Sequence, residues 1–526
     1  QEYAEESVET YREQNASYHE AGNASLVAIH PQTGQILAMV GSADYFDEEI
    51  DGNVNIATRY RQPGSSFKPF VYALAFLNGY SPATVLYDVQ TQFGPGQYPQ
   101  NYDGDFVGPI AIRSALALSR NIPAIKAYFL AGQETEIIPF MEGFGIELDE
   151  TIGYGWPLAL GSGEVRLLDL VGAYSVFANN GTKKEISPIL KIENSDGEVL
   201  EQWEDETGEQ VLDPQVAYLI TDILSDSSIN LGPRLRVNGQ HVAAKTGTSN
   251  KKNEYDDNVP NNTWTLGYST KLAAGVWVGN ADGTSLGYTA SGYDSAAPIW
   301  NDFMTKALAD LSSEAFDQPD GIVEMAVTTS SGLLPSSYTP DDMIKTEKFA
   351  SFNVPTEIDA LWAAATVDGF TGLVATEYSP EWSLEEKEFQ KHVAIIPEYT
   401  YWQAGIDAWA AENDEFEEFL EPTDLDDIHT AETLANAPTI LISSPSPYGL
   451  IAPGRNTVEV EVKALNGLDQ VEFYLEGSLQ YTSVSSPYSG TVRIASNAAS
   501  GSTYEITAYV YDDLGYRSSS TVEVQV

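Results

Sequence analysis

Ser65 and Lys68 have the residue types and the spacing of a lysine-activated serine nucleophile. They belong to the stretch Arg61-Gln-Pro-Gly-Ser-Ser-Phe-Lys-Pro-Phe70, in which Pro63-Gly64 indicates a turn and the following apolar residues recur at helical spacing. Residues three apart share a helix face, so we expect the lysine amine beside the serine hydroxyl. A partly desolvated amine can take the hydroxyl proton and activate the oxygen. The alternative is a helix N-terminus with an ordinary exposed lysine.

The S-x-x-K pattern alone is weak evidence, because roughly one or two copies are expected by chance in a chain of this size. A second copy, Ser249 and Lys252, falls in a predicted polar loop with no apolar helix behind it, and we interpret it as coincidence. The S-x-N pattern also recurs, at 228–230 and 351–353 in loop-like surroundings. Ser119-Arg-Asn121 differs, because it lies between apolar helical runs, and a polar break at a helix junction can face a cleft.

The stretch Lys245-Thr-Gly-Thr248 is more specific, since it ends the apolar strand predicted at Val242–Thr246. Small residues there allow a substrate backbone to lie along the strand edge, as in β-strand addition. The threonine hydroxyls and the lysine can hold a carboxylate. Taken alone, a strand that ends in a turn explains the same residues equally well.

These residues must be positioned by the surrounding elements, and strands are predicted at both ends of a helical stretch. Short strands are predicted at 25–30 and 35–41, joined by a hairpin turn, and again at 242–246, 263–268 and 273–278. Between about 66 and 190 the apolar periodicity is mostly helical, with further helices at 214–224 and 297–311. This order predicts an α+β fold, a mostly antiparallel sheet with an inserted helical subdomain.

The chain changes character beyond residue 311. The pattern V-x-x-x-[ST]-G-L occurs at 327–340 and again, 40 residues later, at 367–380, which predicts two small turn-strand elements. The acidic run 411–429 is interpreted as a solvated linker. From 437 the apolar residues alternate by twos, which is typical of an all-β immunoglobulin-like sandwich, here without a disulfide. We therefore predict four segments: a helical connector (1–20), a catalytic domain (21–311), an acidic linker region with the repeat (312–436) and the sandwich (437–526).

Composition narrows the classes of function. Acidic residues outnumber basic ones 77 to 26, giving a formal charge of −51, so the basic surface required for nucleic-acid binding is missing. The acidity instead indicates solubility or a salty habitat. There is no cysteine, which excludes thiolate sites, and the five histidines show no ligand spacing. We predict neither a metal nor a cofactor.

The order and context of the three motifs are those of penicillin-recognising serine enzymes. Over residues 20–310 the chain resembles the transpeptidase domain of class A penicillin-binding proteins, and the matching stretches are Arg61–Pro69, Ser119–Asn121, Leu160–Val165, Ala173–Gly181, Lys245–Ser249 and Val276–Asn280. The resemblance implies the serine β-lactamase/transpeptidase-like fold. It also implies a serine D,D-transpeptidase that cross-links peptidoglycan stem peptides and is acylated by β-lactams.

The resemblance also implies a role for each residue. Ser65 would be the nucleophile, Lys68 its base, and Ser119 the relay that carries the proton to the leaving amine. Asn121 would bind Lys68 and the substrate amide. Lys245, also a catalytic residue that tunes the local potential, would hold the terminal carboxylate with Thr246 and Thr248. Gly247 and Arg120 would complete the substrate-binding set. The backbone N–H groups of Ser65 and Thr248 would form the oxyanion hole.

Several alternatives remain open at this stage. A β-lactamase shares the motifs but would hydrolyse its acyl-enzyme quickly, and a D,D-carboxypeptidase differs only in using water as the acceptor. A non-catalytic wall-binding protein is a third class. For the sandwich, binding of wall polymer or protein and a plain spacer role are equally open. Class A proteins also carry an upstream glycosyltransferase domain and a membrane anchor. Since the chain begins with Gln1, we expect truncation before it and a location on the extracytoplasmic face of the plasma membrane.

Overall fold

The computed structural model describes residues 1–204, 207–253, 255, 257–413 and 421–526. These residues form two compact units. The first comprises 1–361 and 392–413, and the second comprises 362–391 and the described part of 414–526. Part of the predicted acidic linker, residues 414–420, lies outside the described residues. Among the described helices, none has the length and apolar character needed to cross a bilayer.

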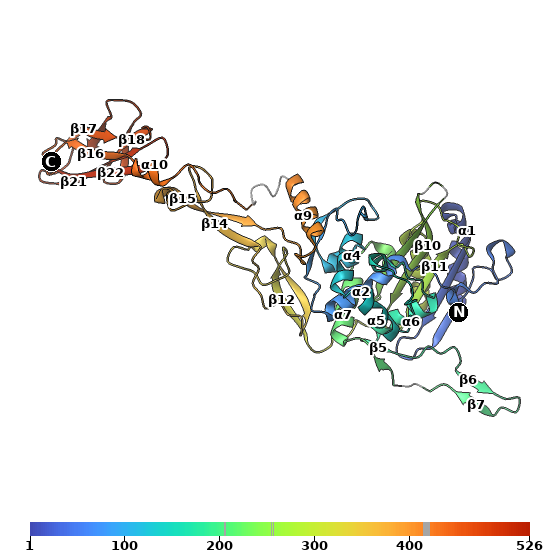
Figure 1. Cartoon of the computed structure of the whole chain (residues 1–526). Helices are drawn as coiled ribbons and strands as arrows, with labels where there is room; N and C mark the ends of the chain where they lie inside the picture. Colours follow the sequence, from blue (N-terminus) through green and yellow to red (C-terminus); the bar gives the residue numbers. More distant parts are fainter. Residues whose placement is uncertain (205–206, 254, 256, 414–420) are drawn as a thin grey trace. The chain divides into compact units, whose positions relative to one another are not determined.

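A five-stranded antiparallel sheet is the centre of the first unit (Figure 1). In spatial order its strands are β2 (Ile36–Val40), β1 (Asn23–Ile29), β11 (Ala273–Gly279), β10 (Asn258–Tyr268) and β9 (Ala243–Lys252). Strands from the two ends of the domain sequence therefore pair directly, as β1 does with β11. The predicted α+β class and antiparallel sheet are confirmed. Strand β9 lies at one edge, so one side of its backbone is not paired within the sheet.

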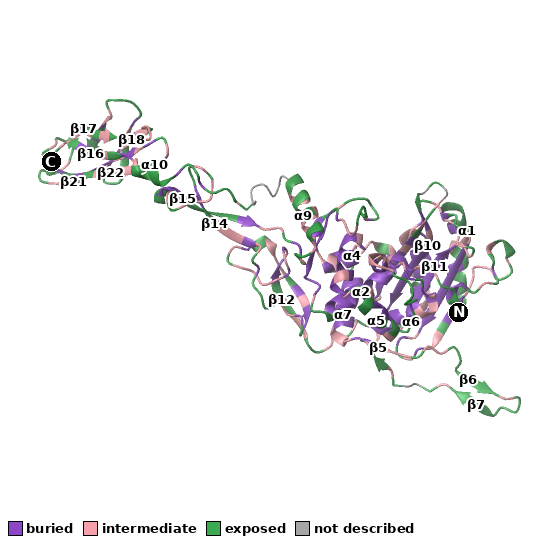
Figure 2. Cartoon of the chain, in the orientation of Figure 1, coloured by how far each residue is buried: buried purple, intermediate pink, exposed green. Residues whose placement is uncertain are grey.

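Both faces of this sheet are covered, which explains why its strands are apolar runs rather than alternating ones. In β1, Val27 and Ile29 join the core beneath the helical subdomain, whereas Leu26 and Ala28 join a second core under α1 (Glu2–His19) and α8 (Ala297–Leu308). All seven residues of β1 are buried. The central strands of the sheet are largely buried, whereas the outer face of α1 and parts of the edge strand β2 are exposed (Figure 2).

The helical subdomain carries the candidate site residues. Its helices are α2 (Lys68–Leu77), α3 (Ile112–Ala117), α4 (Asn121–Leu130), α5 (Glu134–Gly143), α6 (Leu167–Ala178) and α7 (Pro214–Ser225). The short strand pairs in this region are β3–β4 (Val85–Asp88, Gly108–Ala111), β5–β8 (Thr182–Lys183, Glu209–Gln210) and β6–β7 (Lys191–Glu193, Val199–Gln202). Helix α2 is buried over nearly its whole length because its sequence is apolar on every face.

The two sequence repeats fold as equivalent hairpins. β12 (Ile322–Thr328) pairs with β13 (Ile344–Ala350), and β14 (Trp362–Asp368) pairs with β15 (Leu384–Gln390) in the corresponding register. The first hairpin belongs to the first unit and the second hairpin to the second unit. The sequence predicts a single linker region over 312–436, whereas the structure divides it between the two units.

Helix α9 (Thr400–Glu412) was not expected from the sequence. It belongs to the first unit, where Trp402 and Ile406 are buried against Tyr87 and Val89. Trp402, Ile406 and Trp409 recur at helical spacing, a signal that the sequence-based prediction did not use. The partner surface at the end of β3 supplies the apolar contact that the helix needs.

The C-terminal part of the second unit is an all-β sandwich, as predicted. One sheet contains β16 (Thr439–Ser444), β17 (Gly454–Lys463) and β20 (Ser489–Ile494). The other contains β19 (Ser478–Ser483), β18 (Gln470–Leu475), β21 (Thr503–Tyr511) and β22 (Arg517–Gln525). Inward residues of both sheets, among them Val458, Phe473 and Val510, form its core. A short helix, α10 (Ala431–Ala435), precedes it.

Candidate active site

Ser65 lies in the 3₁₀ turn η3 (Gly64–Phe67), which continues directly into α2. The backbone N–H of Lys68 donates to the Ser65 carbonyl, so the two residues are one tight turn apart, where side chains three apart align. Ser65 is half-buried and lines a large cavity, whereas Lys68 is fully buried behind it. Both residues therefore lie at the start of one helix, one turn apart.

Glycines bring the Ser65 turn into backbone contact with strand β9. Gly64 has φ +58°, and a Cβ there would lie 2.3 Å from the Thr248 carbonyl oxygen. On the strand side, a Cβ at Gly247 would lie 2.2 Å from the Pro63 carbonyl oxygen. Only residues without side chains permit this approach. The Lys245–Thr248 strand thus forms one wall beside the serine.

Lys68 Nζ donates hydrogen bonds to the Ser119 carbonyl (2.7 Å), the Arg120 carbonyl (3.1 Å) and Asn121 Oδ1 (2.8 Å). Three acceptors suit an ammonium group. Burial nevertheless pulls the pKa of Lys68 well below its ordinary value, and the positive charges of Lys245 and Arg120 act in the same direction. Asp88 opposes them. The amine is therefore far easier to deprotonate than an exposed lysine, as a base requires.

Ser119 joins the two lysines. Lys245 Nζ donates to Ser119 Oγ (2.7 Å) and to the Thr246 carbonyl (3.1 Å). Ser119 has φ +60°, a left-handed conformation that is uncommon for a non-glycine residue and that recurs at functional sites. Burial lowers the pKa of Lys245 to about 7. The result is a continuous chain from Lys245 through Ser119 to Lys68 and Asn121.

Arg120 is the predicted site residue that the structure places elsewhere. Its guanidinium is buried and paired with Asp88 (Nε–Oδ2, 2.7 Å) and Asp103 (Nη1–Oδ2, 2.6 Å). It also donates to the Asp105 carbonyl. Its side chain does not line the cavity, and only its backbone carbonyl takes part in the lysine contacts. A role in substrate binding is therefore not supported by its position.

The cavity in front of these residues has a volume of about 1070 Å³. Of the predicted residues, those that line it are Ser65, Ser119, Asn121, Thr246 and Thr248. Both lysines lie behind this surface. The walls carry several tyrosines and amides, and the lining includes one carboxylate, Asp294. A hollow lined by hydroxyls, with two buried lysines behind them, is suited to an anionic, peptide-like ligand.

The prediction that Ser249 lies in a polar loop is wrong. Residues 249–252 continue strand β9, because Asn258–Asn262 of β10 pair with them. The Ser249 hydroxyl donates to Asn261 Oδ1 and accepts from Asn262 Nδ2, both at 2.9 Å. Ser249 also lines the cavity, but its hydroxyl is already bonded to these two amides, so the second S-x-x-K remains interpreted as coincidence.

Sequence reasoning missed three residues that border the site. Asp88 is fully buried and holds Arg120, and Gln100 and Asn101 contact Asn121. Asn101 is only 5% exposed, although it lies in a stretch without helix or strand. No local signal marks it, because an asparagine in such a stretch usually faces solvent.

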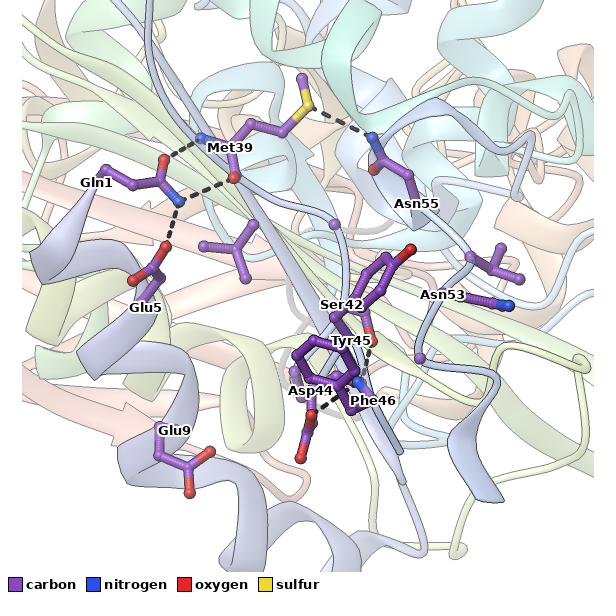
Figure 3. Close-up of a pocket in the computed structure, with 15 residues that line it drawn as sticks. Gln1, Glu5, Glu9, Met39, Ser42, Asp44, Tyr45, Phe46, Asn53 and Asn55 are labelled. Atoms are coloured by element: carbon purple, nitrogen blue, oxygen red, sulfur yellow. Dashed lines mark hydrogen bonds between the residues drawn. The ribbon is translucent and has the colours of Figure 1, made fainter. Parts of the chain in front are cut away.

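A second hollow, of about 610 Å³, lies between α1 and the loop that follows β2 (Figure 3). The Gln1 side chain bonds the backbone of Met39 there, donating to its carbonyl (3.0 Å) and accepting from its N–H (2.9 Å). None of the predicted site residues lines it. We do not assign it a part in the chemistry.

In the part of the chain that the structure describes, one group of side chains has the makeup to hold a metal ion: Asp368, Asp426 and His429 of the second unit, all buried. Both ring nitrogens of His429 already face acceptors, Asp426 Oδ2 at 2.5 Å and the Leu514 carbonyl at 2.7 Å. Acceptors on both nitrogens favour the imidazolium form, and they raise the pKa of His429 above its ordinary value although burial opposes this. The three side chains therefore pair with one another as a buried ion cluster.

Models of three protein families match successive parts of the chain. Residues 24–305 match "Penicillin binding protein transpeptidase domain", 318–364 match "Penicillin-binding protein 1A, C-terminal domain", and 438–508 match "Bacterial Ig domain". The first match spans more than half of the chain. The last one agrees with the sandwich.

Individual relatives point the same way. Penicillin-binding protein 1A of Rickettsia conorii is 30% identical over 351 residues, covering 61% of this chain and 43% of the relative. The protein of the same name from Pseudomonas aeruginosa is 29% identical over 398 residues, covering 65% and 46%. The matched part is therefore less than half of the length of these relatives.

Solved structures show the same fold. Penicillin-binding protein 1A from Haemophilus influenzae superposes with a TM-score of 0.55 at 27% identity, over 64% of this chain and 54% of that one. PonA1 of Mycobacterium tuberculosis, solved in complex with penicillin V, gives 0.52 at 24% identity, over 61% of this chain and 87% of that one.

Proposed function

The chain belongs to the penicillin-binding protein transpeptidase family, and from this we propose that it is a serine D,D-transpeptidase that cross-links peptidoglycan stem peptides. The observation that carries the proposal is the hydrogen-bonded chain Lys245–Ser119–Lys68–Asn121 at the base of the cavity lined by Ser65. Cross-linking of this kind takes place outside the cytoplasmic membrane, which is the location we propose.

In acylation, Ser65 Oγ attacks the carbonyl carbon between the two terminal D-alanines of a stem peptide. Lys68 Nζ, in its neutral form, takes the hydroxyl proton. The C–N bond breaks, the terminal D-alanine leaves as an amine, and Ser119 passes it a proton from the lysine pair. The acyl group remains as an ester on Ser65. Attack by an amino group of a neighbouring stem completes the cross-link and frees the serine.

Strand β9 would hold the substrate during this step. The terminal carboxylate would accept from the hydroxyls of Thr246 and Thr248, with Lys245 behind them. The N–H groups of Ser65 and Thr248 would stabilise the oxyanion, each commonly worth roughly 3 kcal/mol. The contact of Gly64 with the Thr248 backbone supports this pairing, since it keeps the two segments adjacent. A β-lactam with its carboxylate would acylate Ser65 as a substrate mimic.

The test is labelling by a fluorescent penicillin. The intact chain should form a stable adduct, and Ser65→Ala should form none. Ser66→Ala is the matched control, because its hydroxyl bonds the Pro63 carbonyl (2.8 Å) inside the same turn and takes no part in the scheme. Absence of label on the intact chain contradicts the proposal, and label lost within seconds indicates a β-lactamase.

The acceptor requires a second assay. A defined donor stem peptide, supplied with an acceptor stem, should yield a cross-linked dimer detectable by mass spectrometry. Release of D-alanine without dimer would show a D,D-carboxypeptidase instead.

A further inference from the structure

Asn101 is a buried amide whose polar groups are all engaged around the start of α4. Its Nδ2 donates to Asp88 Oδ1 (2.7 Å) and to the Asp105 carbonyl (2.8 Å), and its Oδ1 accepts from the Asn121 backbone N–H (2.7 Å). The residue therefore links a buried carboxylate to the first residue of the helix that carries the S-x-N asparagine.

This link replaces an ordinary helix cap. The first N–H groups of a helix have no partner within the helix and need an external acceptor. The N-cap residue of α4 is Arg120, which supplies no side-chain cap. Asn101 supplies that acceptor from a segment twenty residues earlier, and it thereby sets where α4 begins.

The Asn121 side chain is held by the same segment. Its Nδ2 donates to the Gln100 carbonyl (2.8 Å), which turns Oδ1 toward Lys68 Nζ at 2.8 Å. Residues 100 and 101 thus determine both the backbone position and the amide orientation of Asn121. Without them the Oδ1 acceptor would not be directed at the lysine.

Asp88 anchors the arrangement from behind. It is fully buried, and its two oxygens accept from Asn101 and from Arg120, whose carbonyl is another acceptor of Lys68. Buried ionic groups of this kind are stable only when every polar atom has a partner. The ion pair therefore also fixes the Arg120 backbone next to the lysine.

We propose that Asn101, anchored by Asp88, is a positioning residue of the acylation centre, acting through Asn121 on Lys68. The inference rests on the proposed function. Asn101→Ala removes the cap of α4 and frees Asn121, and misplacement of such a group by about 1 Å can cost about 100-fold in rate. We expect the second-order rate of acylation by a penicillin to fall about 10- to 100-fold.

The pH profile separates positioning from general damage. Acceptors around Lys68 favour its ammonium form, so loosening Asn121 lowers the pKa of Lys68 further and moves the acidic limb of the acylation profile to lower pH. A loss of fold alone lowers the whole profile without moving it. Asn353→Ala is the matched control, because that buried amide bonds the Phe76 and Tyr80 carbonyls at the other end of α2. It should lower the melting temperature without moving the limb.

A double-mutant cycle completes the test. If Asn101 acts through Asn121, the rate lost in Asn101→Ala with Asn121→Ala should equal that of Asn121→Ala alone. Additive losses, or an acidic limb that stays in place in Asn101→Ala, overturn the inference. If the unmodified protein is not acylated at all, the proposed function fails before the cycle is measured, so the two failures are distinguishable.

Discussion

At the scale of single residues, the two buried lysines differ in what surrounds them. Lys68 has three acceptors within hydrogen-bond distance, whereas Lys245 donates to one hydroxyl and one carbonyl. Burial lowers the pKa of both, to about 7 for Lys245. The proposed mechanism requires Lys68 neutral and Lys245 charged, so the pH dependence of acylation would report on both.

The rate of acylation by an anionic penicillin should be bell-shaped in pH. It rises as Lys68 loses its proton and falls above about pH 7 as Lys245 becomes neutral and holds the ligand carboxylate less firmly. Stopped-flow acylation rates from pH 5 to 10 measure both limbs. The penicillin methyl ester lacks the carboxylate, and its profile should lack the falling limb. A falling limb that persists with the ester would contradict the role of Lys245.

Gly64→Ala should abolish acylation, because its Cβ would overlap the Thr248 backbone and φ +58° is unfavourable for alanine. We expect a loss of about 100-fold or more in the acylation rate, measured with the same fluorescent penicillin. Gly79→Ala is the control. Gly79 also has positive φ (+100°) but faces open space just after α2, so that variant should lose stability without the same loss of rate.

At the scale of elements, the equivalent hairpins β12–β13 and β14–β15 contact different parts of the protein. In the first unit, Arg113 bonds Glu347 of β13 and Asp222 of α7, an ion network that ties the β12–β13 hairpin to the helical subdomain. In the second unit, the end of β14 contributes Asp368 to the cluster with Asp426 and His429. His429 also reaches the Leu514 carbonyl in the turn between β21 and β22. The second hairpin is thus joined to the sandwich by a charged histidine.

The stability of the second unit should depend on the charge of His429. Burial disfavours the imidazolium, but the Leu514 carbonyl, Asp426 and Asp368 outweigh it and raise the pKa of His429 above 6.5. Its contribution is therefore complete below pH 6.5 and is lost as the pH rises through the folded-state pKa. Burial also opposes the charge of Asp426, yet hydrogen bonds from Ser379 and His429 hold its pKa below 3.8.

The stability that Asp426 contributes is present above pH 3.8 and is lost at lower pH. Thermal unfolding of the second unit should therefore be most resistant between about pH 4 and 6.5. His429→Gln should remove the decline at the alkaline side. His392→Gln is the control, because His392 belongs to the first unit. If the melting temperature of His429→Gln still fell above pH 6.5, the charge of His429 would not be what stabilises the second unit.

At the scale of the whole molecule, the chain has separate hydrophobic cores. The sandwich has its own cluster around Val458 and Phe473, and the catalytic part has two clusters on the faces of its sheet. The two clusters of the first unit share one sheet, whereas the sandwich has a core of its own, and compact units with separate cores unfold with their own transitions. The formal charge of −51 adds self-repulsion that salt screens.

Calorimetry should therefore resolve two transitions, of which covalent penicillin raises only one. The acyl group makes its non-covalent contacts only while the first unit is folded, so it should stabilise that unit alone. The Ser65→Ala variant, treated in the same way, should show both transitions but no shift of either. A shift of both transitions by penicillin would show that the two units unfold together.

Much of the molecule was predictable from local pattern. Alternation of apolar and polar residues predicted the sandwich, and apolar runs predicted the strands of the central sheet. The order of the motifs predicted Ser65, Lys68, Ser119 and Lys245 as site residues. The strands and helices are encoded within a few residues of each other, since their periodicities depend on neighbours in the chain, whereas the distant motifs were grouped by the family resemblance. The 40-residue repeat likewise predicted two similar elements.

Only the tertiary structure decided how those residues are held. It turned Arg120 away from the cavity toward Asp88, extended β9 through Ser249, docked α9 through Trp402, and made Asn101 the cap of α4. Each outcome depends on a partner distant in sequence, and a buried polar group must find its partner wherever the folded chain places it. The motifs therefore indicated which residues could react, and the packing of distant segments against one another determined which other residues hold them in place.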